Sequence, residues 1–153
     1  MRSPEERLAA LDLELPPVVT PMAAYVSAVR SGNLVWTAGQ LPMVRGELPV
    51  AGLVGADVDL DRAYELARIC ALNALAAVAA EAGSLSAVVR VVKVVGFVAA
   101  APGFTAIPQV VNGASELLGE VFGDAGKHAR SAVGVAALPM GAPVEVELVV
   151  EVR

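Results

Sequence analysis

The stretch AVVRVVKVVGFVAA, residues 87–100, places valine at alternate positions on both faces of an extended chain. It predicts a β-strand, because successive side chains of a strand point to opposite faces of the sheet. One face would carry Val88, Val92, Val94 and Val98, and the other Val89, Val91, Val95 and Phe97. A strand that is apolar on both faces is covered on both faces. Because the helices of so small a domain can cover only one face, we expect a partner subunit on the other.

Two helices are predicted on either side of this strand. Residues 60–82 are rich in Ala and Leu, follow an aspartate that can cap them, and stop before Gly83. Residues 106–122 follow Thr105, a possible cap, and carry apolar side chains at helical spacing, although Asn112-Gly113 would alone favour a turn. The expected buried stripe of the second helix consists of Val110, Val111, Ala114, Leu117, Leu118 and Val121.

The remaining segments predict two pairs of strands and one short helix. Residues 23–30 and 33–38 read as strands joined by a glycine-containing turn. Residues 130–138 and 143–152 read as a second pair, joined as a hairpin through a turn around Met140-Gly141. Residues 3–13 begin with a capping box and predict an N-terminal helix. The order ββ, helix, β, helix, ββ indicates an α+β fold, an antiparallel or mixed sheet packed against two helices.

The composition indicates one domain, residues 1–153, that associates with itself. Hydrophobic residues make up 56% and charged residues 18% of the 153 positions, more apolar than ordinary soluble domains. A membrane is not expected to take up this surface, because the apolar runs are interrupted by Asn73, Glu81, Arg90 and Lys93. The first six residues, charged with both signs, do not resemble a signal peptide. We therefore expect burial between subunits.

Charge and cysteine content exclude several classes of function. The net charge of -5 opposes sequence-independent binding to nucleic acid, because such binding needs clustered Lys and Arg. The single cysteine, Cys70, rules out an intrachain disulfide, suits a reducing cytoplasm and is expected to be inert in the core. With one His and one Cys, no Cys/His metal site is expected within a chain, although carboxylate-only sites remain possible.

Arg130 is the most informative candidate for a functional residue. It opens a predicted strand whose same face continues with Ala132, Gly134 and Ala136, small residues that would leave room before the guanidinium. A planar guanidinium suits a carboxylate or phosphate bidentately. The alternative is an arginine that caps a strand or pairs with an acidic neighbour.

Glu145, Glu147 and Glu151 share one face of the last predicted strand. They form either a solvated acidic face or a group in which one carboxylate acts as a base or holds water. In the expected hairpin Glu145 would lie opposite Ala136, about 20 Å from Arg130, so one chain could not bring both to one small molecule. Two subunits could do so.

Three other positions allow a structural and a functional interpretation. Tyr25 would be either a half-buried strand residue or part of a site. His128, the only histidine, is expected in a loop and not in catalysis. Gly39-Gln40 follows a predicted strand, where it is either an ordinary connection or a segment that presents backbone N–H groups to a ligand.

Taken together, these pieces resemble the RidA/YjgF family of imine deaminases, also labelled L-PSP endoribonucleases, over residues 20–153. The most specific match to the family is Arg130-Ser131, followed by Val133, Leu138-Pro139 and Val144-Glu145-Val146-Glu147. A second match runs from Tyr25 through Gly32-Asn33-Leu34 to Thr37-Ala38-Gly39-Gln40-Leu41-Pro42. Asn112, in the second predicted helix, also lies at a position that resembles the family.

The resemblance implies a chorismate-mutase-like fold, a homotrimer and three sites in the clefts between subunits, with no cofactor. It implies that Arg130 holds the carboxylate of an imine or enamine derived from an amino acid, and that Glu145 positions water. The substrate-binding set that it implies consists of Tyr25, Ala38, Gly39, Asn112, Arg130 and Ala132.

Two functions from different classes follow from these residues. The first is hydrolysis of reactive 2-imino acids to 2-keto acids and ammonia, favoured by Arg130 with Glu145. The second is a non-catalytic binder of small carboxylates, favoured by Ala38, which stands where many members of the family carry Ser. Ala132 stands where many members carry Cys, a difference that is tolerable if the position acts through its backbone carbonyl. A ribonuclease is less favoured, because the chain is acidic.

Overall fold

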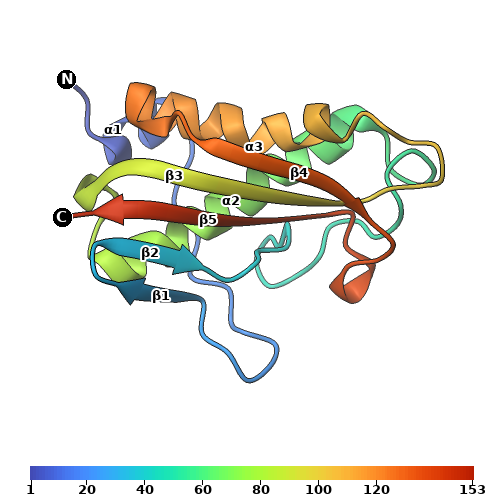
Figure 1. Cartoon of the computed structure of the whole chain (residues 1–153), viewed down its shortest axis with the longest axis horizontal. Helices are drawn as coiled ribbons and strands as arrows, with labels where there is room; N and C mark the ends of the chain where they lie inside the picture. Colours follow the sequence, from blue (N-terminus) through green and yellow to red (C-terminus); the bar gives the residue numbers. More distant parts are fainter.

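The computed structural model describes all residues, 1–153, and shows one mixed sheet with helices on one of its faces (Figure 1). The strands are β1 (Ala28–Ser31), β2 (Leu34–Thr37), β3 (Val88–Ala99), β4 (Ala129–Val135) and β5 (Val144–Val152). The helices are α1 (Pro4–Ala10), α2 (Leu60–Ala82) and α3 (Ile107–Phe122), with single 3₁₀ turns η1 (Leu85–Ala87), η2 (Gly123–Gly126) and η3 (Pro139–Gly141). The strand order is β1-β2-β5-β3-β4. The predicted α+β architecture with two long helices is therefore confirmed.

The core lies between the sheet and the α2–α3 layer. It includes the expected stripe of α3 and the inward side of β5, which alternates buried and half-buried residues along its whole length. By length and composition α2 could cross a membrane, which the interrupted apolar runs had not suggested. However, 61% of its most apolar window is buried inside the domain, so α2 is the core helix of this fold.

The last two strands do not form the expected hairpin. β4 pairs in parallel with β3 at the sheet edge, whereas β5 lies between β2 and β3 and is antiparallel to both. The chain therefore passes over the end of β3 between β4 and β5. The hairpin was predicted because the connector between residues 138 and 143 is short. The length of a connector does not show whether another strand lies between the two strands that it joins. Alternating burial along β5 fits its central place in the sheet.

The faces of β3 differ from the strict alternation expected. Register shifts occur between Val88 and Arg90 and again between Val91 and Lys93. A bulge inserts an extra residue and reverses the faces beyond it. As a result Val91 is fully buried with Val94 and Val98, whereas Val92 is exposed.

The first hairpin is confirmed, but its strands are shorter than expected. Ser31 pairs with Leu34 across a two-residue turn, and Gly32 takes the positive φ that such a turn requires at its first position. Residues 23–27 lie outside β1, so Tyr25 belongs to a loop and not to a strand.

The helix ends follow the predicted capping chemistry in part. Ser3 and Glu6 form the reciprocal capping box of α1, which ends at Ala10 and is shorter than expected. Asp59 caps α2, and Gly83 ends it with a positive φ. Thr105 is not a cap, because α3 begins after Ala106 without a side-chain cap.

Asn112-Gly113 lies inside α3 and makes no turn, because Gly113 is where α3 approaches α2. A Cβ atom at Gly113 would lie 2.0 Å from the backbone oxygen of Tyr64. The glycine thus permits a helix contact that any other residue would push apart.

The sheet face opposite the helices remains uncovered in the single chain. Val29, Trp36 and Val133 are 52%, 51% and 44% exposed there, on three different strands. Half-buried Phe97 and Val95 lie between them on β3. The apolar second face expected from residues 87–100 is therefore real, although its members partly differ.

Gly113→Ala should destabilise the protein by about 1–3 kcal/mol, because the added methyl group meets backbone of α2 that cannot rotate away. Gly119→Ala is the matched control, since no atom lies within 4 Å of its Cβ position on the same helix. It should stabilise by up to about 1 kcal/mol through helix propensity. Urea unfolding measures both. Equal effects of the two substitutions would contradict the assigned contact.

Candidate functional site

Arg130 is held by α3 on the helix side of the sheet. One guanidinium nitrogen, Nη1, donates to Asn112 Oδ1 at 2.8 Å and to Ser115 Oγ at 3.2 Å, and Nη2 donates to the Pro108 carbonyl at 3.3 Å. A guanidinium has five N–H donors, so two remain, the Nε–H and one on Nη2. Adjacent donors of this kind suit a carboxylate. Asn112 and Arg130, predicted from sequence as members of one site, are thus in direct contact.

The small residues that follow Arg130 have a different role from the one expected. A Cβ atom at Gly134 would lie 2.9 Å from Cδ1 of Ile107, so the space beside the strand is taken by α3. Ala132 is half-buried and packs against the core. These small residues let β4 lie close to α3. The part of Arg130 that stays open is therefore its two N–H groups without a partner.

Ser115 and His128 extend the Arg130 contacts into a chain. Ser115 Oγ lies 2.9 Å from His128 Nε2, and His128 Nδ1 lies 2.6 Å from the Gly126 carbonyl. Burial is the main factor that lowers the pKa of His128, and the nearby Arg130 lowers it further. His128 lies in a loop, as expected. Ser115 was not predicted, and its only signal is its position one helical turn after Asn112.

Glu145 belongs to a second group of candidate residues, at the start of β5 and on the open face of the sheet. Gly39 lies against its carboxylate, because a Cβ atom at Gly39 would be 2.5 Å from Glu145 Oε2. The backbone of Gln40 pairs with Val146 in both directions, at 2.8 and 3.0 Å. Ala38 donates to the Ser27 carbonyl, whereas the Gly39 N–H makes no hydrogen bond within the chain and is free for a ligand.

A cavity of about 290 Å³ opens in front of Glu145. Its walls are the loop before β1, the loop after β2, η3 and the start of β5. The lining residues include Tyr25, Gly39 and Glu145, and a shallower hollow on the open sheet face adds Ala38 and Trp36. Four predicted site residues therefore gather here: Tyr25, Ala38, Gly39 and Glu145.

Burial is the main factor that raises the pKa of Glu145 above its usual range, and the charge of neighbouring Glu147 raises it further. A carboxyl group with a raised pKa exchanges protons more readily near neutral pH than an exposed one does. This property fits a group that accepts a proton from water and returns it.

The two groups do not meet within one chain. Arg130 pairs with Val94, and Val94 with Leu148, three residues beyond Glu145 on β5. Three residues along and two strands across correspond to roughly 14 Å between the Cα atoms. The side chains also leave opposite faces, since Arg130 contacts α3 and Glu145 lines the hollow on the open face. The expectation that one chain keeps the two groups apart is confirmed, but the hairpin and the separation of about 20 Å are wrong, since the Cα atoms lie roughly 14 Å apart across two strands.

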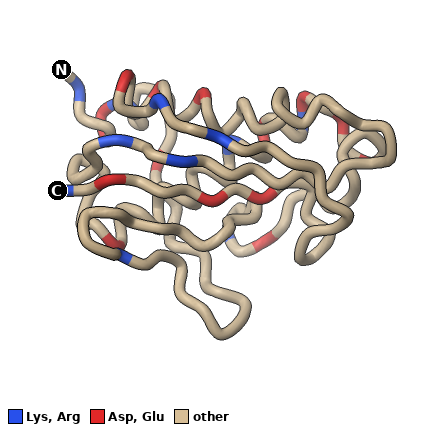
Figure 2. The backbone as a smooth tube through the Cα atoms, in the orientation of Figure 1, with Lys and Arg blue, Asp and Glu red and all other residues tan.

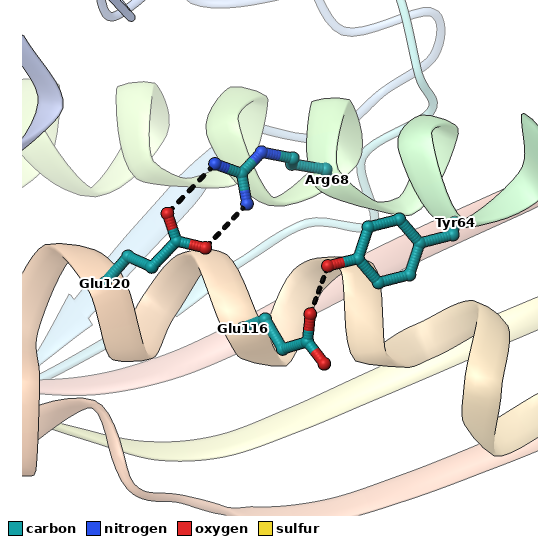
Figure 3. Close-up of polar contacts among 4 residues, drawn as sticks. All are labelled: Tyr64, Arg68, Glu116 and Glu120. Carbon is teal, nitrogen blue, oxygen red and sulfur yellow. Dashed lines mark hydrogen bonds and ion pairs between the residues drawn. The ribbon is translucent and has the colours of Figure 1, made fainter. Parts of the chain in front are cut away.

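Polar contacts on the outer surface join α2 to α3 (Figure 3). Arg68 forms a bidentate ion pair with Glu120 at 3.1 and 3.2 Å, and the Tyr64 hydroxyl donates to Glu116. The hydrogen bond to Glu116 raises the pKa of Tyr64 to about 12. These pairs fix α3, and therefore Asn112 and Ser115, against the core helix.

The other groups with reactive chemistry are dispersed. Cys70 is fully buried, and burial raises its pKa, which keeps the thiol protonated. No three His, Cys, Asp or Glu side chains gather as a metal site would require. Basic side chains are scattered along the backbone, without a continuous stripe (Figure 2).

Glu145→Gln should stabilise the protein at pH 7 and lose this advantage in acid. A raised pKa in the folded state means that stability falls as pH rises from the unfolded value, about 4.3, through the folded one. Removing the ionised form should therefore raise the unfolding midpoint at pH 7 and leave it unchanged below about pH 4. Thermal unfolding from pH 3 to 8 measures it. A Glu145→Gln variant less stable than wild type at pH 7 would contradict this account.

Comparison with known proteins places the chain in a family. Residues 5–152 match the family described as "YjgF/chorismate mutase-like, putative endoribonuclease". Protein TCP17 of Trypanosoma cruzi is 43% identical over 95% of this chain and 92% of its own. The structure of Atu1372 from Agrobacterium tumefaciens is 47% identical, with a TM-score of 0.92 over 98% of this chain and 92% of its own.

Two further solved structures widen the comparison. A "putative endoribonuclease" from Shewanella oneidensis has a TM-score of 0.96 at 32% identity, covering 99% of this chain and all of its own. The structure of E. coli TdcF with bound serine has a TM-score of 0.64 at 26% identity, covering 89% and 93%. With the mixed sheet and its two-helix layer, these matches show that the chain belongs to the YjgF/chorismate-mutase-like family.

Proposed function

We propose that this protein hydrolyses 2-imino acids, or their enamine tautomers, to 2-keto acids and ammonia in clefts between subunits. The observation that carries this proposal is the division of the candidate site. An arginine with two free donors lies on one side of the sheet, and a carboxyl group beside an unpaired N–H lies on the other. Each group is incomplete alone, and each is suited to one part of a small anionic substrate.

The reaction needs few groups because a protonated imine is already electrophilic. Arg130 would bind the substrate carboxylate through its free donors, while Glu145 accepts a proton from water as the oxygen attacks the C=N carbon. Glu145 then returns the proton to the nitrogen, and the C–N bond breaks to release ammonia. The hydroxyl oxygen forms the carbonyl as its own proton passes to Glu145, from which the departing ammonia takes it up as ammonium. The raised pKa of Glu145 suits both transfers, and no cofactor is required.

The comparison with TdcF supports the class of ligand. TdcF was solved with bound serine, a small amino acid with a carboxylate and an amino group, and belongs to the same structural group as this chain. An imine derived from such an amino acid keeps the carboxylate that Arg130 would hold. The substrate's remaining side chain would occupy the cavity beside Tyr25.

A homotrimer would complete the site. The open sheet face carries exposed apolar residues from β1, β2 and β4, a surface that soluble monomers rarely leave uncovered. The hollow that contains Glu145 borders this face at Trp36. A neighbour that covers the face would therefore come close to Glu145 and could present its own Arg130.

The alternative is a trimer that binds small carboxylates without turnover, as a sensor. It is favoured by Ala38, which lacks the hydroxyl that many members of the family carry beside Gly39. Nuclease activity, the name attached to several relatives, is less favoured, because the net charge of -5 opposes binding to phosphates. A reducing, cytoplasmic setting suits the single buried thiol.

Light scattering should give three times the 15.6 kDa chain mass at micromolar concentration. Trp36→Glu should shift the mass towards the monomer, because a charge on the open face cannot be buried against a neighbour. Ala9→Glu, an exposed position on α1, is the control and should leave the trimer intact. A stable wild-type monomer would end the proposal of a shared site.

Mixed trimers test whether catalysis is divided between chains. Arg130→Ala and Glu145→Ala homotrimers should each release no ammonia from freshly generated 2-aminoacrylate. In an equal random mixture about three quarters of the trimers contain both chains. By cyclic symmetry each of these has one boundary in three where intact Arg130 meets intact Glu145, so about a quarter of wild-type activity should return.

The control is co-purification of untagged Glu145→Ala chains with tagged Arg130→Ala chains, which shows that subunits exchange. Verified mixed trimers without recovered activity would overturn the shared site. A wild-type protein that binds 2-oxobutyrate but releases no ammonia would instead favour the binder.

A further inference from the structure

We propose that Ser115 and His128 are positioning residues that hold Arg130 ready for a carboxylate through a one-directional hydrogen-bond relay. The relay runs from the guanidinium through the serine hydroxyl and the imidazole to the Gly126 carbonyl. This role deepens the proposed function, because it assigns how the anion-binding half of that site is oriented.

The direction of the relay follows from its last member. A carbonyl oxygen can only accept, so His128 Nδ1 must donate the proton of its 2.6 Å contact with Gly126. In neutral histidine Nε2 is then an acceptor, and Ser115 Oγ at 2.9 Å must donate to it. With its proton committed, the serine oxygen presents lone pairs to Arg130 Nη1 at 3.2 Å. Every group in the chain has one possible role.

Protonation of His128 would reverse the middle of the relay. Nε2 would then donate to Ser115 Oγ, and two cationic groups would point at one hydroxyl. The charged groups on the elements packed around His128 include three arginines: Arg130 on β4, Arg90 on β3, which donates to the Lys127 carbonyl, and Arg7 on α1, which lies beside Gly123. The carboxylates there are Glu116 on α3, which is bound to Tyr64, and Asp124, which forms an exposed ion pair with Lys127. None of these offers His128 a carboxylate partner, so the neutral form is the one that the site favours.

The pair also has the arrangement of a nucleophile and its base, but a positioning role fits better. Neither Ser115 nor His128 lines the cavity or the hollow beside Glu145, and no donor other than Arg130 reaches the serine oxygen. The serine hydroxyl is instead one of three acceptors that fix two edges of the guanidinium. What remains free is the part of Arg130 that would meet a ligand.

His128 is the only histidine, so its ring resonances report on the relay without interference. NMR should show the Nδ1–H tautomer at neutral pH and a pKa below the usual value of about 6.5. Arg130→Gln removes the repelling charge and Ser115→Ala removes the donor to Nε2, so each should raise this pKa. Ser115→Thr, which keeps the hydroxyl, should restore the wild-type value. Ser84→Ala, whose side chain caps nothing, is the matched control.

Calorimetry with 2-oxobutyrate gives the functional readout. Ser115→Ala should weaken binding by about tenfold, the effect of losing one hydrogen bond to a charged group, and Ser115→Thr should recover most of it. A His128 pKa that is the same in wild type, Arg130→Gln and Ser115→Ala would overturn the relay, as would unchanged 2-oxobutyrate affinity in Ser115→Ala. If wild type binds no 2-oxobutyrate while the pKa of His128 still responds to both substitutions, the proposed function fails and the relay stands.

Discussion

A five-stranded sheet has two faces, and this chain has helices for only one of them. α2 and α3 cover the inner side of β2, β3 and β5, whereas Trp36, Val29 and Val133 stay exposed on the other. The same division separates the candidate chemistry, since Arg130 leaves the sheet towards α3 and Glu145 leaves it towards the open face. The exposed apolar face and the separation of the two candidate groups are both consequences of one arrangement.

Helix α3 connects core packing to the anion-binding half. Gly113 lets it approach α2, and two polar pairs on the outer surface fix it there. From this fixed position Asn112, Ser115 and the Pro108 carbonyl hold three donors of Arg130. Rigid support of this kind leaves the remaining donors oriented before a ligand arrives, which lowers the entropic cost of binding.

Much of the fold followed from local sequence signals, because these signals act over a few residues. The bounds of α2, the first hairpin and the capping box of α1 were all predictable from caps, turns and apolar spacing. The partners of β4 and the bulges of β3 were not, because both depend on strands distant in sequence. The candidate residues were named from family motifs, and the structure brings Arg130 into contact with Asn112 and Gly39 into contact with Glu145. Ser115 was missed, since its role exists only through contacts with β4 and the loop before it.

A shared site requires one ligand to lie between Arg130 of one subunit and Glu145 of another. A crystal structure of the assembly with 2-oxobutyrate would show where the ligand binds. We expect a carboxylate bound by the Nε and Nη2 donors of Arg130, with the carbonyl carbon facing the Glu145 carboxyl group of the neighbouring chain. A ligand held only by residues of one chain, or bound away from Arg130, would contradict it.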